Sequence, residues 1–214
     1  MTALPQADPY RILVVCTGNI CRSPFAEQLL RDSFVRIGVA VADDTWADSV
    51  QVTSAGTHAM VGNAIEPAMA TFLEPYGAGA LNHAARQLTG EHIVDADLVL
   101  ALTRGHRRDV VRLLPSASRH VFALNEFARL LEDARAANAV EIDFSATVQE
   151  TMTVIADAAA SRRGFTPALD DPGVDDVADP YGRDSSVYAA SAGQIAEIIG
   201  RVETAVLAAL RAAE

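Results

Sequence analysis

A short apolar run that ends abruptly in a polar loop is the strongest constraint on the fold. Residues 11–16 are Arg-Ile-Leu-Val-Val-Cys, which is typical of a strand buried on both faces of a parallel sheet. A polar segment follows at residues 17–24, and apolar side chains then recur at helical spacing over residues 25–34. We expect Ser23 to cap this helix and Pro24 to occupy its first position. The chain therefore starts with a strand, a loop and a helix.

The same alternation of strands and helices continues along the chain. We expect further strands at residues 50–53, 97–102 and 119–124, and helices at residues 67–76, 107–114, 126–137, 145–163 and 186–213. Asn125 is expected to cap the helix that follows it, and residues 165–182, rich in Pro, Gly and Asp, are expected to form a long surface loop. Such alternation predicts one α/β domain, with a parallel sheet covered by helices on both faces.

Composition and charge argue against several classes of protein. Half of the 214 residues are hydrophobic and 21% are charged, as in ordinary globular proteins. The formal net charge is −11 and lysine is absent, which argues against nucleic-acid binding because phosphate backbones are held by surplus cations. No apolar run is long enough to cross a bilayer, and no secretion signal is recognisable. We therefore expect a cytoplasmic protein without a membrane partner.

The polar loop has the features of an anion site. In an open α/β sheet, ligands bind where strands end and helices begin, and the Cys16–Arg22 loop lies at that edge. Backbone N–H groups that curl before a helix N-terminus bind anions, helped by the helix dipole. Gly18 permits close approach of the backbone, and Asn19 tolerates the left-handed conformation that a tight curl needs. Arg22 can bind two oxygens of a phosphate with its planar fork.

Cys16 begins this loop, and its thiol has two interpretations. The N–H donors, the helix N-terminus and Arg22 all favour an ionised thiol, which would be a nucleophile aimed at phosphorus. The alternative is a cysteine that simply packs at a strand end, as most buried cysteines do. A cysteine and an arginine separated by five residues are weak evidence alone. The strand before the loop, the glycine within it and the helix after it favour the nucleophile.

Four motifs occur in a fixed order along the chain: CTGNICRSP at 16–24, SAGT at 54–57, HAAR at 83–86 and DPYG at 179–182. In these motifs the chain resembles the low-molecular-weight protein tyrosine phosphatases, over roughly residues 10–130 and 176–212. The resemblance implies a flavodoxin-like fold with a four-stranded parallel sheet. It also implies a two-step hydrolysis of phosphomonoesters that requires neither a metal nor a cofactor.

The resemblance assigns roles to individual residues. Cys16 would attack the phosphomonoester and form a phosphocysteine. Arg22 would stabilise charge on the equatorial oxygens, and Asp179 would protonate the leaving phenolate and then activate water. Ser54 and His83 match residues that hold the loop in shape, a structural role for the histidine. The phosphate-binding residues would be Thr17, Gly18, Asn19, Ile20, Cys21, Arg22 and Ser23.

Three residues near these motifs need separate comment. Ser23 matches the hydroxyl that supports the thiolate in the family. Cys21 matches a second loop cysteine that forms a reversible, protective disulfide with Cys16, and the alternative is a small packing residue. Glu27 is interpreted only as an acid in the first helical turn, favoured by the helix dipole.

Two other Asp-Pro pairs compete with Asp179 for the role of general acid. Asp8 precedes the first strand, and because a six-residue strand spans roughly 20 Å, we expect it at the opposite edge of the sheet from Cys16. Asp171 is the alternative acid, since it lies in the same loop as Asp179. Motif and order favour Asp179.

The resemblance indicates a deep cleft for an aryl phosphate, with Ile20, Met60 and Tyr181 as its walls. In the related bacterial arginine phosphatases a threonine occupies the position of Ile20, so the isoleucine favours phosphotyrosine. Met60 stands where many relatives have an aromatic residue, which leaves the peptide preference open. The expected partner is a phosphotyrosine protein, for example a bacterial tyrosine kinase.

Three other functions remain as alternatives. A protein-arginine phosphatase has the same fold. A thiol-dependent arsenate reductase shares the fold and a similar loop, although the thioredoxin-coupled type needs further cysteines and none follows Cys21. A catalytically silent phosphate-binding module is disfavoured because Cys16, Arg22 and Asp179 are all present.

The main departure from the family is length. About forty extra residues, roughly 132–176, precede the DPYG motif and include the expected helix at 145–163. This insertion could serve as a lid, a docking surface or a dimer contact, or it could pack on the flank of the sheet, which we prefer. We expect one phosphatase domain over residues 1–214, as a monomer or weak dimer.

Overall fold

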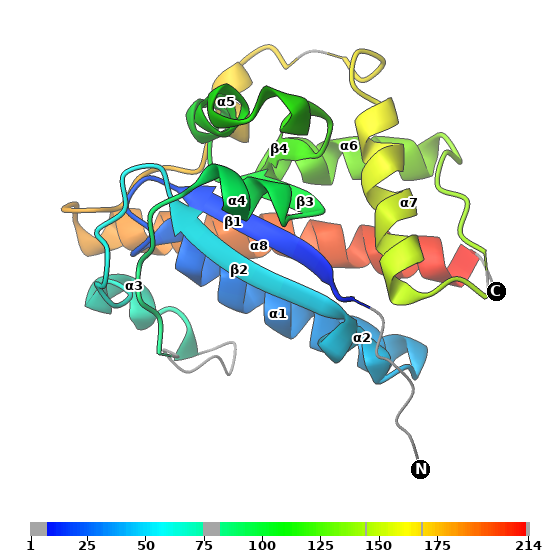
Figure 1. The fold of residues 1–214 in the computed structure, drawn as a ribbon, viewed down its shortest axis with the longest axis horizontal. Coiled ribbons are helices and arrows are strands. Elements are labelled where there is room, and N and C mark those ends of the chain that lie inside the picture. The colour runs from blue at the N-terminus through cyan, green and yellow to red at the C-terminus, as the bar shows by residue number, and fades with distance from the viewer. Residues whose placement is uncertain (1–7, 75–81, 144, 168, 213–214) are drawn as a thin grey trace.

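The computed structural model describes residues 8–74, 82–143, 145–167 and 169–212. Its sheet has four parallel strands in the order β2-β1-β3-β4 (Figure 1). The strands are β1 (Tyr10–Cys16), β2 (Val50–Gly56), β3 (Leu98–Ala101) and β4 (Val121–Ala123). This strand order is that of flavodoxin-like folds, so the predicted fold class is confirmed.

Helices connect and cover the strands (Figure 1). They are α1 (Arg22–Val41), α2 (Thr45–Ser49), α3 (Pro67–Ala70), α4 (Gly90–Val94), α5 (Arg104–Leu113), α6 (Leu124–Ala136), α7 (Val148–Ser161) and α8 (Ser185–Ala212), with 3-10 turns η2 (Pro115–Arg119) and η3 (Pro172–Asp175). The short helices α2 and α4 were not expected from the sequence. The helix predicted at 67–76 is too long, because α3 ends at Ala70 and residues 71–74 are not α-helical; residues 75–76 lie outside the described residues.

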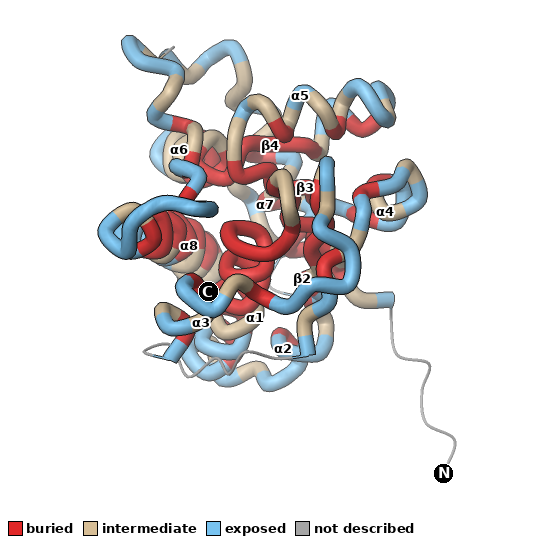
Figure 2. Tube along the Cα trace, turned by 90° about the vertical axis from the view of Figure 1, so that its left-hand side faces the viewer, coloured by how far each residue is buried: buried red, intermediate tan, exposed pale blue. Residues whose placement is uncertain are grey.

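The sheet is buried on both faces, as its apolar strands predict. Along β1, Ile12 and Val14 join a core cluster with side chains of α1, α6 and α8. Leu13 and Val15 point the other way, into a smaller cluster with α4 and α5. None of these four side chains is more than 1% exposed, and Figure 2 shows the strands buried between the helices. The alternation follows from the two-residue period of a strand.

The carboxyl ends of the strands meet at one edge of the sheet. Cys16 at the end of β1 is in register with Gly56 at the end of β2, and Val15 is in register with Ala101 at the end of β3. The Cys16–Arg22 loop therefore leaves the sheet at the edge where parallel α/β folds bind ligands.

Two expected helix caps are wrong. Ser23 is the second residue of α1, which begins at Arg22, and its hydroxyl contacts the Cys16 thiol instead. Asn125 is the second residue of α6. The N-terminus of α6 is instead satisfied by Glu126, whose Oε2 accepts from the N–H of Ala123 at 2.9 Å. In both helices a polar side chain was needed for a tertiary contact, which sequence rules for caps do not detect.

Two expected loops also differ from the structure. Residues 54–56, expected to follow a strand, lie within β2. The segment 165–182, expected to be a surface loop, contains η3, and its Asp175 and Val177 are buried. Both segments border the Cys16–Arg22 loop, so their burial affects the site.

Helix α7 lies in the segment interpreted as an insertion. It begins after a capping box in which Thr147 Oγ1 accepts from Glu150 N and the Glu150 carboxylate accepts from Thr147 N. Its Met152 and Ile155 are buried in the main core cluster, and the helix packs chiefly against α6. This is the flank packing that we prefer. The division into one domain with an insertion at 132–176 stays a prediction.

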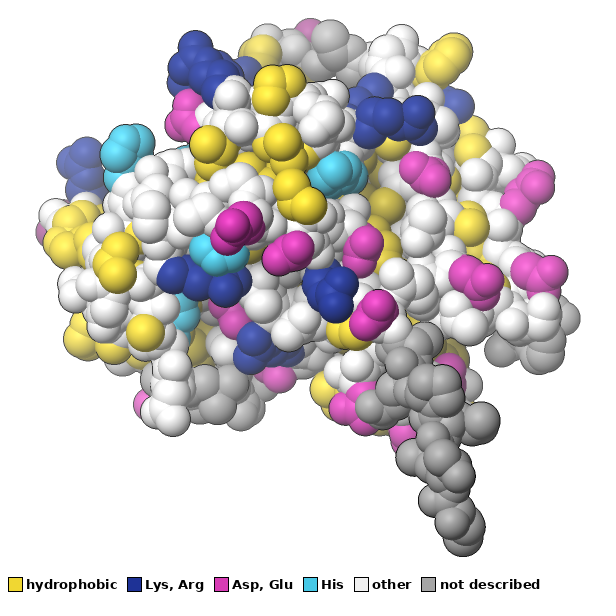
Figure 3. Space-filling model, in the orientation of Figure 1, with side chains coloured by type: hydrophobic (Ala, Val, Ile, Leu, Met, Phe, Trp, Pro, Cys, Tyr) yellow, Lys and Arg dark blue, Asp and Glu magenta, His cyan; other side chains and the backbone are white. Residues whose placement is uncertain are grey.

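The surface carries charges of both signs. Among the coloured residues of the face in Figure 3, acidic and basic side chains are interspersed. That face therefore presents no broad field of one sign that would attract a polyanion. Within the described residues, no helix combines the length and the apolar character that a membrane crossing requires.

Candidate active site

The Cys16–Arg22 loop curls tightly between β1 and α1. Asn19, which is fully buried, has the left-handed backbone conformation with φ of 56°. This confirms the expectation for Asn19, because asparagine tolerates that conformation better than most residues. The curl turns the Asn19 N–H toward the Cys16 Sγ, at 3.3 Å.

The carbonyl groups of the loop are turned outward and are all engaged. Four accept hydrogen bonds from backbone N–H groups of the segment after β2. The pairs, donor first, are Thr57 with Cys16 (2.9 Å), His58 with Thr17 (3.0 Å), Met60 with Gly18 (2.9 Å) and Glu66 with Ile20 (2.8 Å). With the carbonyls held outside, the N–H groups are left to converge on the inner side, which is the geometry of an anion site.

His83 engages the remaining carbonyl. Its Nε2 lies 2.7 Å from the Asn19 carbonyl oxygen, and because a carbonyl only accepts, Nε2 carries the hydrogen. The structure thus places His83 where a loop-supporting residue is expected. Gly56 allows the close approach on the other side, since a Cβ there would lie 2.4 Å from the Thr17 carbonyl oxygen.

The Asn19 side chain organises the polar groups beneath the loop. Its Oδ1 accepts from the backbone N–H of Arg86 at 2.9 Å, which fixes the orientation of the amide. Its Nδ2 therefore donates to two hydroxyls, Ser23 Oγ at 2.9 Å and Ser54 Oγ at 2.8 Å. Arg86 also donates from Nε to the Ser54 carbonyl at 2.7 Å.

The direction of the remaining bonds follows from these. Ser54 Oγ donates to the Glu27 carboxylate at 2.6 Å. Ser23 Oγ accepts from Asn19 and keeps its own hydrogen, which it donates to Cys16 Sγ, 3.0 Å away, when the sulfur is a thiolate, because a thiolate can only accept. A donor aimed at the sulfur stabilises the thiolate over the thiol. The network therefore delivers a hydrogen-bond donor to the expected nucleophile.

Glu27 belongs to the polar network beneath the loop, which the sequence interpretation missed. It was expected to be only a first-turn acid, but it is 8% exposed and hydrogen-bonded to Ser54. Its other oxygen pairs with Arg31 at 2.6 Å. The spacing along the chain gave no signal, because the partner Ser54 lies on another strand.

Arg22 is buried against the loop that carries the DPYG motif. Its Nη1 donates to the Val177 carbonyl at 3.1 Å, and its Nη2 pairs with Asp179 Oδ2 at 2.7 Å. Nη2 also lies 3.5 Å from Thr17 Oγ1. The Nε atom is buried without a hydrogen-bond partner among the described residues. An unsatisfied buried donor is costly, and a bound anion would satisfy it.

The structure brings Asp179, and not the competing aspartates, to the loop. Asp179 is half exposed beside Arg22. Asp171 is instead used within its own turn, where Oδ1 accepts from Gly173 N at 2.8 Å. Asp8 lies by Arg11, near the start of β1, as expected.

The three expected substrate walls differ in exposure. Tyr181 is 52% exposed and Met60 is 38% exposed. A Cβ on Gly18 would lie 3.8 Å from Met60 Cγ, so Met60 lies close to the loop. Ile20 is only 5% exposed and belongs to the main core cluster. The wall roles stay predictions.

Cys21 is also buried in the core cluster. Burial, with the neighbouring Cys16 and Glu66, raises the pKa of the Cys21 thiol to about 12. Both cysteines are free thiols. A protonated, buried thiol is a poor partner in disulfide exchange, so the structure favours the packing interpretation of Cys21.

His106 is a second residue that the sequence interpretation missed. It lies in the first turn of α5, and its Nδ1 and Nε2 contact Thr103 Oγ1 at 2.9 Å and Thr17 Oγ1 at 2.8 Å. Burial and the nearby Arg22 lower the pKa of His106 to about 4. The ring is therefore neutral near pH 7 and connects α5 to the loop. The pattern Thr-x-x-His after a predicted strand was the available signal.

Comparison with known proteins agrees with this geometry. Residues 11–157 match the family model of low molecular weight phosphotyrosine protein phosphatase. The chain is 36% identical over 115 residues to "Probable low molecular weight protein-tyrosine-phosphatase EpsP" of Ralstonia solanacearum, covering 54% of this chain and 70% of that protein. It is 39% identical over 119 residues to the protein-arginine-phosphatase of Geobacillus stearothermophilus, covering 56% and 72%.

A solved structure is similar over most of the chain. The YwlE arginine phosphatase from Geobacillus stearothermophilus aligns with a TM-score of 0.59 and 29% identity, covering 92% of each chain. Relatives with two different substrate names therefore share this fold and sequence pattern.

Removing the Ser23 hydroxyl tests the donor to the sulfur. In Ser23→Ala we expect the alkylation of Cys16 by iodoacetamide at mildly acidic pH to slow about tenfold or more. The reacting species is the thiolate, and a hydrogen bond to a charged group contributes roughly 1.5–3 kcal/mol. Ser191→Ala is the control, since Ser191 Oγ is buried without a hydrogen bond among the described residues. Equal rates in wild type and Ser23→Ala would contradict the assigned bond direction.

The buried His106 predicts a pH dependence of stability. Folding lowers the pKa of His106 from 6.5 to about 4. Between pH 6.5 and pH 4 the unfolded chain therefore binds a proton on this ring more readily than the folded chain. The free energy of unfolding is expected to fall as the pH falls through this range. In His106→Gln, the fall in the free energy of unfolding over this range should be smaller by about 2–3 kcal/mol. Urea unfolding at several pH values measures it, and parallel curves for the two proteins would contradict it.

Proposed function

This chain belongs to the low molecular weight phosphotyrosine protein phosphatase family, and on that premise we propose that it hydrolyses phosphotyrosine in proteins through a phosphocysteine on Cys16. The observation that carries the proposal is the convergence at one loop of a hydrogen-bonded Cys16 thiol, inward N–H groups and the buried Arg22. A nucleophile at the base of a phosphate site fits phosphoryl transfer.

The first step would begin with the phosphate entering the loop. It would accept hydrogen bonds from the inner N–H groups and from the unpaired Nε of Arg22. It would also compete with Asp179 for Nη2 of Arg22, which frees the carboxyl group. Once released from Arg22, Asp179 would have to be in its protonated form to act as the acid. Cys16 Sγ would attack phosphorus, so that an S–P bond forms while the P–O bond to the phenol breaks, and the protonated Asp179 would give its proton to the leaving oxygen.

The second step would restore the enzyme. Asp179, now ionised, would take a proton from a water molecule as that water attacks the phosphocysteine. The S–P bond breaks, inorganic phosphate leaves, and the Ser23 hydroxyl stabilises the returning thiolate. Cysteine, arginine and aspartate supply the nucleophile, the charge stabilisation and the proton, so we propose that the reaction requires neither a metal nor a cofactor.

A protein-arginine phosphatase is the second candidate, because that name is carried by a relative and by a solved structure from Geobacillus stearothermophilus. Ile20 in place of the threonine of the related arginine phosphatases, together with the exposed ring of Tyr181 near the site, favours phosphotyrosine. Thiol-dependent arsenate reduction is a third candidate. Its thioredoxin-coupled type is disfavoured, since that type needs a further cysteine to relay the disulfide and none follows Cys21.

The setting of the enzyme is also proposed. A thiol catalyst with two free cysteines suits a reducing compartment, which favours the cytoplasm. The partner would be a phosphotyrosine protein such as a bacterial tyrosine kinase, and the chain would act as a monomer or weak dimer.

Two substitutions test the mechanism. Cys16→Ser should abolish turnover of a phosphotyrosine peptide, since the nucleophile is lost. Asp179→Ala should lower kcat/KM about 10²–10⁴-fold, the range that a general acid supplies. EDTA should leave the wild-type rate unchanged. Phosphate release from matched phosphotyrosine and phosphoarginine peptides is then compared, and we expect the phosphotyrosine peptide to be preferred.

The outcomes separate the candidates. Preference for the phosphoarginine peptide would contradict the assigned substrate while leaving the chemistry intact. Turnover by Cys16→Ser near the wild-type rate would contradict the mechanism, and inhibition by EDTA would contradict metal independence.

A further inference from the structure

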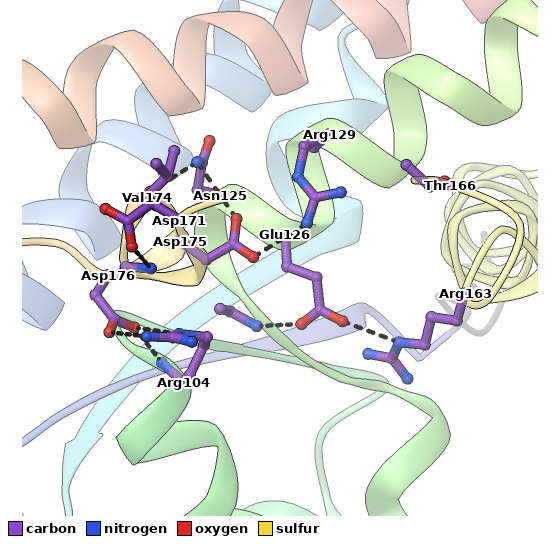
Figure 4. A network of polar contacts seen from close by, with 12 residues as sticks. Arg104, Asn125, Glu126, Arg129, Arg163, Thr166, Asp171, Val174, Asp175 and Asp176 are labelled. Carbon is purple, nitrogen blue, oxygen red and sulfur yellow. Dashed lines mark hydrogen bonds and ion pairs between the residues drawn. The ribbon is translucent and has the colours of Figure 1, made fainter. Parts of the chain in front are cut away.

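The segment before Asp179 is held by side chains from several distant elements (Figure 4). Residues 174–177 comprise the end of η3 and the two residues after it, and they lead toward the proposed acid. Within them a carboxylate, Asp175, and an apolar side chain, Val177, are both buried. A surface loop needs no such anchoring. The anchoring therefore calls for a physical explanation.

Helix α6 provides the first anchor. Asn125 Nδ2 donates to the Val174 carbonyl at 3.0 Å, and Arg129 Nη2 pairs with Asp175 Oδ2 at 3.0 Å. Figure 4 shows Asp175 between these two side chains. Asn125 is itself fixed, because its Oδ1 accepts from Arg201 Nη1 of α8 at 2.7 Å.

Helix α5 and strand β3 provide the second anchor. Asp176 Oδ1 accepts from the backbone N–H of Arg104 at 2.6 Å, and its Oδ2 pairs with the Arg104 guanidinium at 3.1 Å. Although burial opposes its charge, these bonds lower the pKa of Asp176. The N–H of Val177 then donates to the Leu102 carbonyl just beyond β3, at 2.9 Å.

The anchored segment 174–177 and the Asp179 that follows it place two hydrogen-bond acceptors against the Arg22 guanidinium. The Val177 carbonyl binds Arg22 Nη1 and the Asp179 carboxylate binds Arg22 Nη2. A shift of this segment would therefore move the proposed acid and disturb the arginine together. General-acid catalysis depends on placing the carboxyl group within hydrogen-bond reach of the leaving oxygen.

We infer that Asn125 and Asp175 are positioning residues for the proposed acid: they fix residues 174–177 on α6 and so set the reach of Asp179 toward the leaving oxygen. The inference rests on the proposed function, since it assumes that Asp179 is the acid. The ion pair of buried Asp175 with Arg129 fixes the position of the segment. It adds little to the free energy of unfolding, because the cost of burying the charges offsets their attraction.

The same helix offers a matched control. Asp133 of α6 pairs with Arg162 at 2.6 Å and accepts from Thr166 Oγ1 at 2.8 Å. It therefore ties the end of α7 to α6 through the same kind of ion pair as Asp175, but without touching residues 174–177. Asp133→Asn and Asp175→Asn thus each remove one carboxylate charge paired with an arginine, the Asp133 side chain being the more exposed of the two.

The test compares kcat/KM for phenyl phosphate and dinitrophenyl phosphate, because only the poorer leaving group, phenolate, depends strongly on the acid. In Asp175→Asn and in Asn125→Ala, we expect the phenyl phosphate value to fall about tenfold or more, and by less than the roughly 10²–10⁴-fold that complete loss of a general acid costs. The dinitrophenyl phosphate value should change less than about threefold, and Asp133→Asn should leave the ratio of the two values unchanged.

Thermal unfolding is measured for every variant, and the double variant Asp175→Asn with Arg129→Gln avoids an unpaired buried cation if the single change prevents folding. The positioning role would be overturned if kcat/KM fell equally for both substrates. It would also be overturned if the ratio of the two kcat/KM values matched that of Asp133→Asn. Asp179→Ala is assayed beside them. If its ratio equals that of wild type, Asp179 is not the acid, and the failure then lies in the proposed function.

Discussion

The active site depends first on the hydrogen bonds that hold the carbonyls of the Cys16–Arg22 loop on its outer side. Each carbonyl from residue 16 to residue 20 accepts from a donor elsewhere in the chain, four from backbone N–H groups and one from His83. In a planar trans peptide the C=O and the following N–H point in opposite directions, so fixing the carbonyls on the outer side also turns the N–H groups inward. The anion site is thus a consequence of ordinary backbone pairing around a left-handed Asn19.

A small number of paired polar groups determines the charge distribution in the site. Glu27 accepts from the Ser54 hydroxyl, and the Asn19 amide donates to Ser54 and Ser23. The Ser23 hydroxyl is thereby oriented toward the Cys16 sulfur. Buried Arg22 is held between the loop and the segment 174–179, which supplies it with a carbonyl and a carboxylate. The nucleophile and the proposed acid are therefore set by separate networks that meet at one guanidinium.

The sequence predicted the local parts of this arrangement and missed the distant ones. The four strands and the left-handed Asn19 followed from periodicity and residue chemistry. The family motifs assigned Arg22 and Asp179 to one site but did not predict the ion pair between them. The cap roles of Ser23 and Asn125 were wrong, because tertiary partners claimed both side chains. Glu27 and Asp175 were missed for the same reason, since their partners are remote in the chain and no local pattern encodes such contacts. His106 had a local signal in Thr103, but its contact with Thr17 of the loop is equally remote.

The central claim is that phosphate passes through Cys16. The most direct measurement is a rapid acid quench of wild-type protein during turnover of a phosphotyrosine peptide, followed by peptide mapping. The account predicts a phosphoryl group on the peptide containing Cys16, bonded to sulfur, and none in Cys16→Ser. A phosphoryl group on any other side chain, or rapid turnover without a protein-bound phosphate, would contradict it.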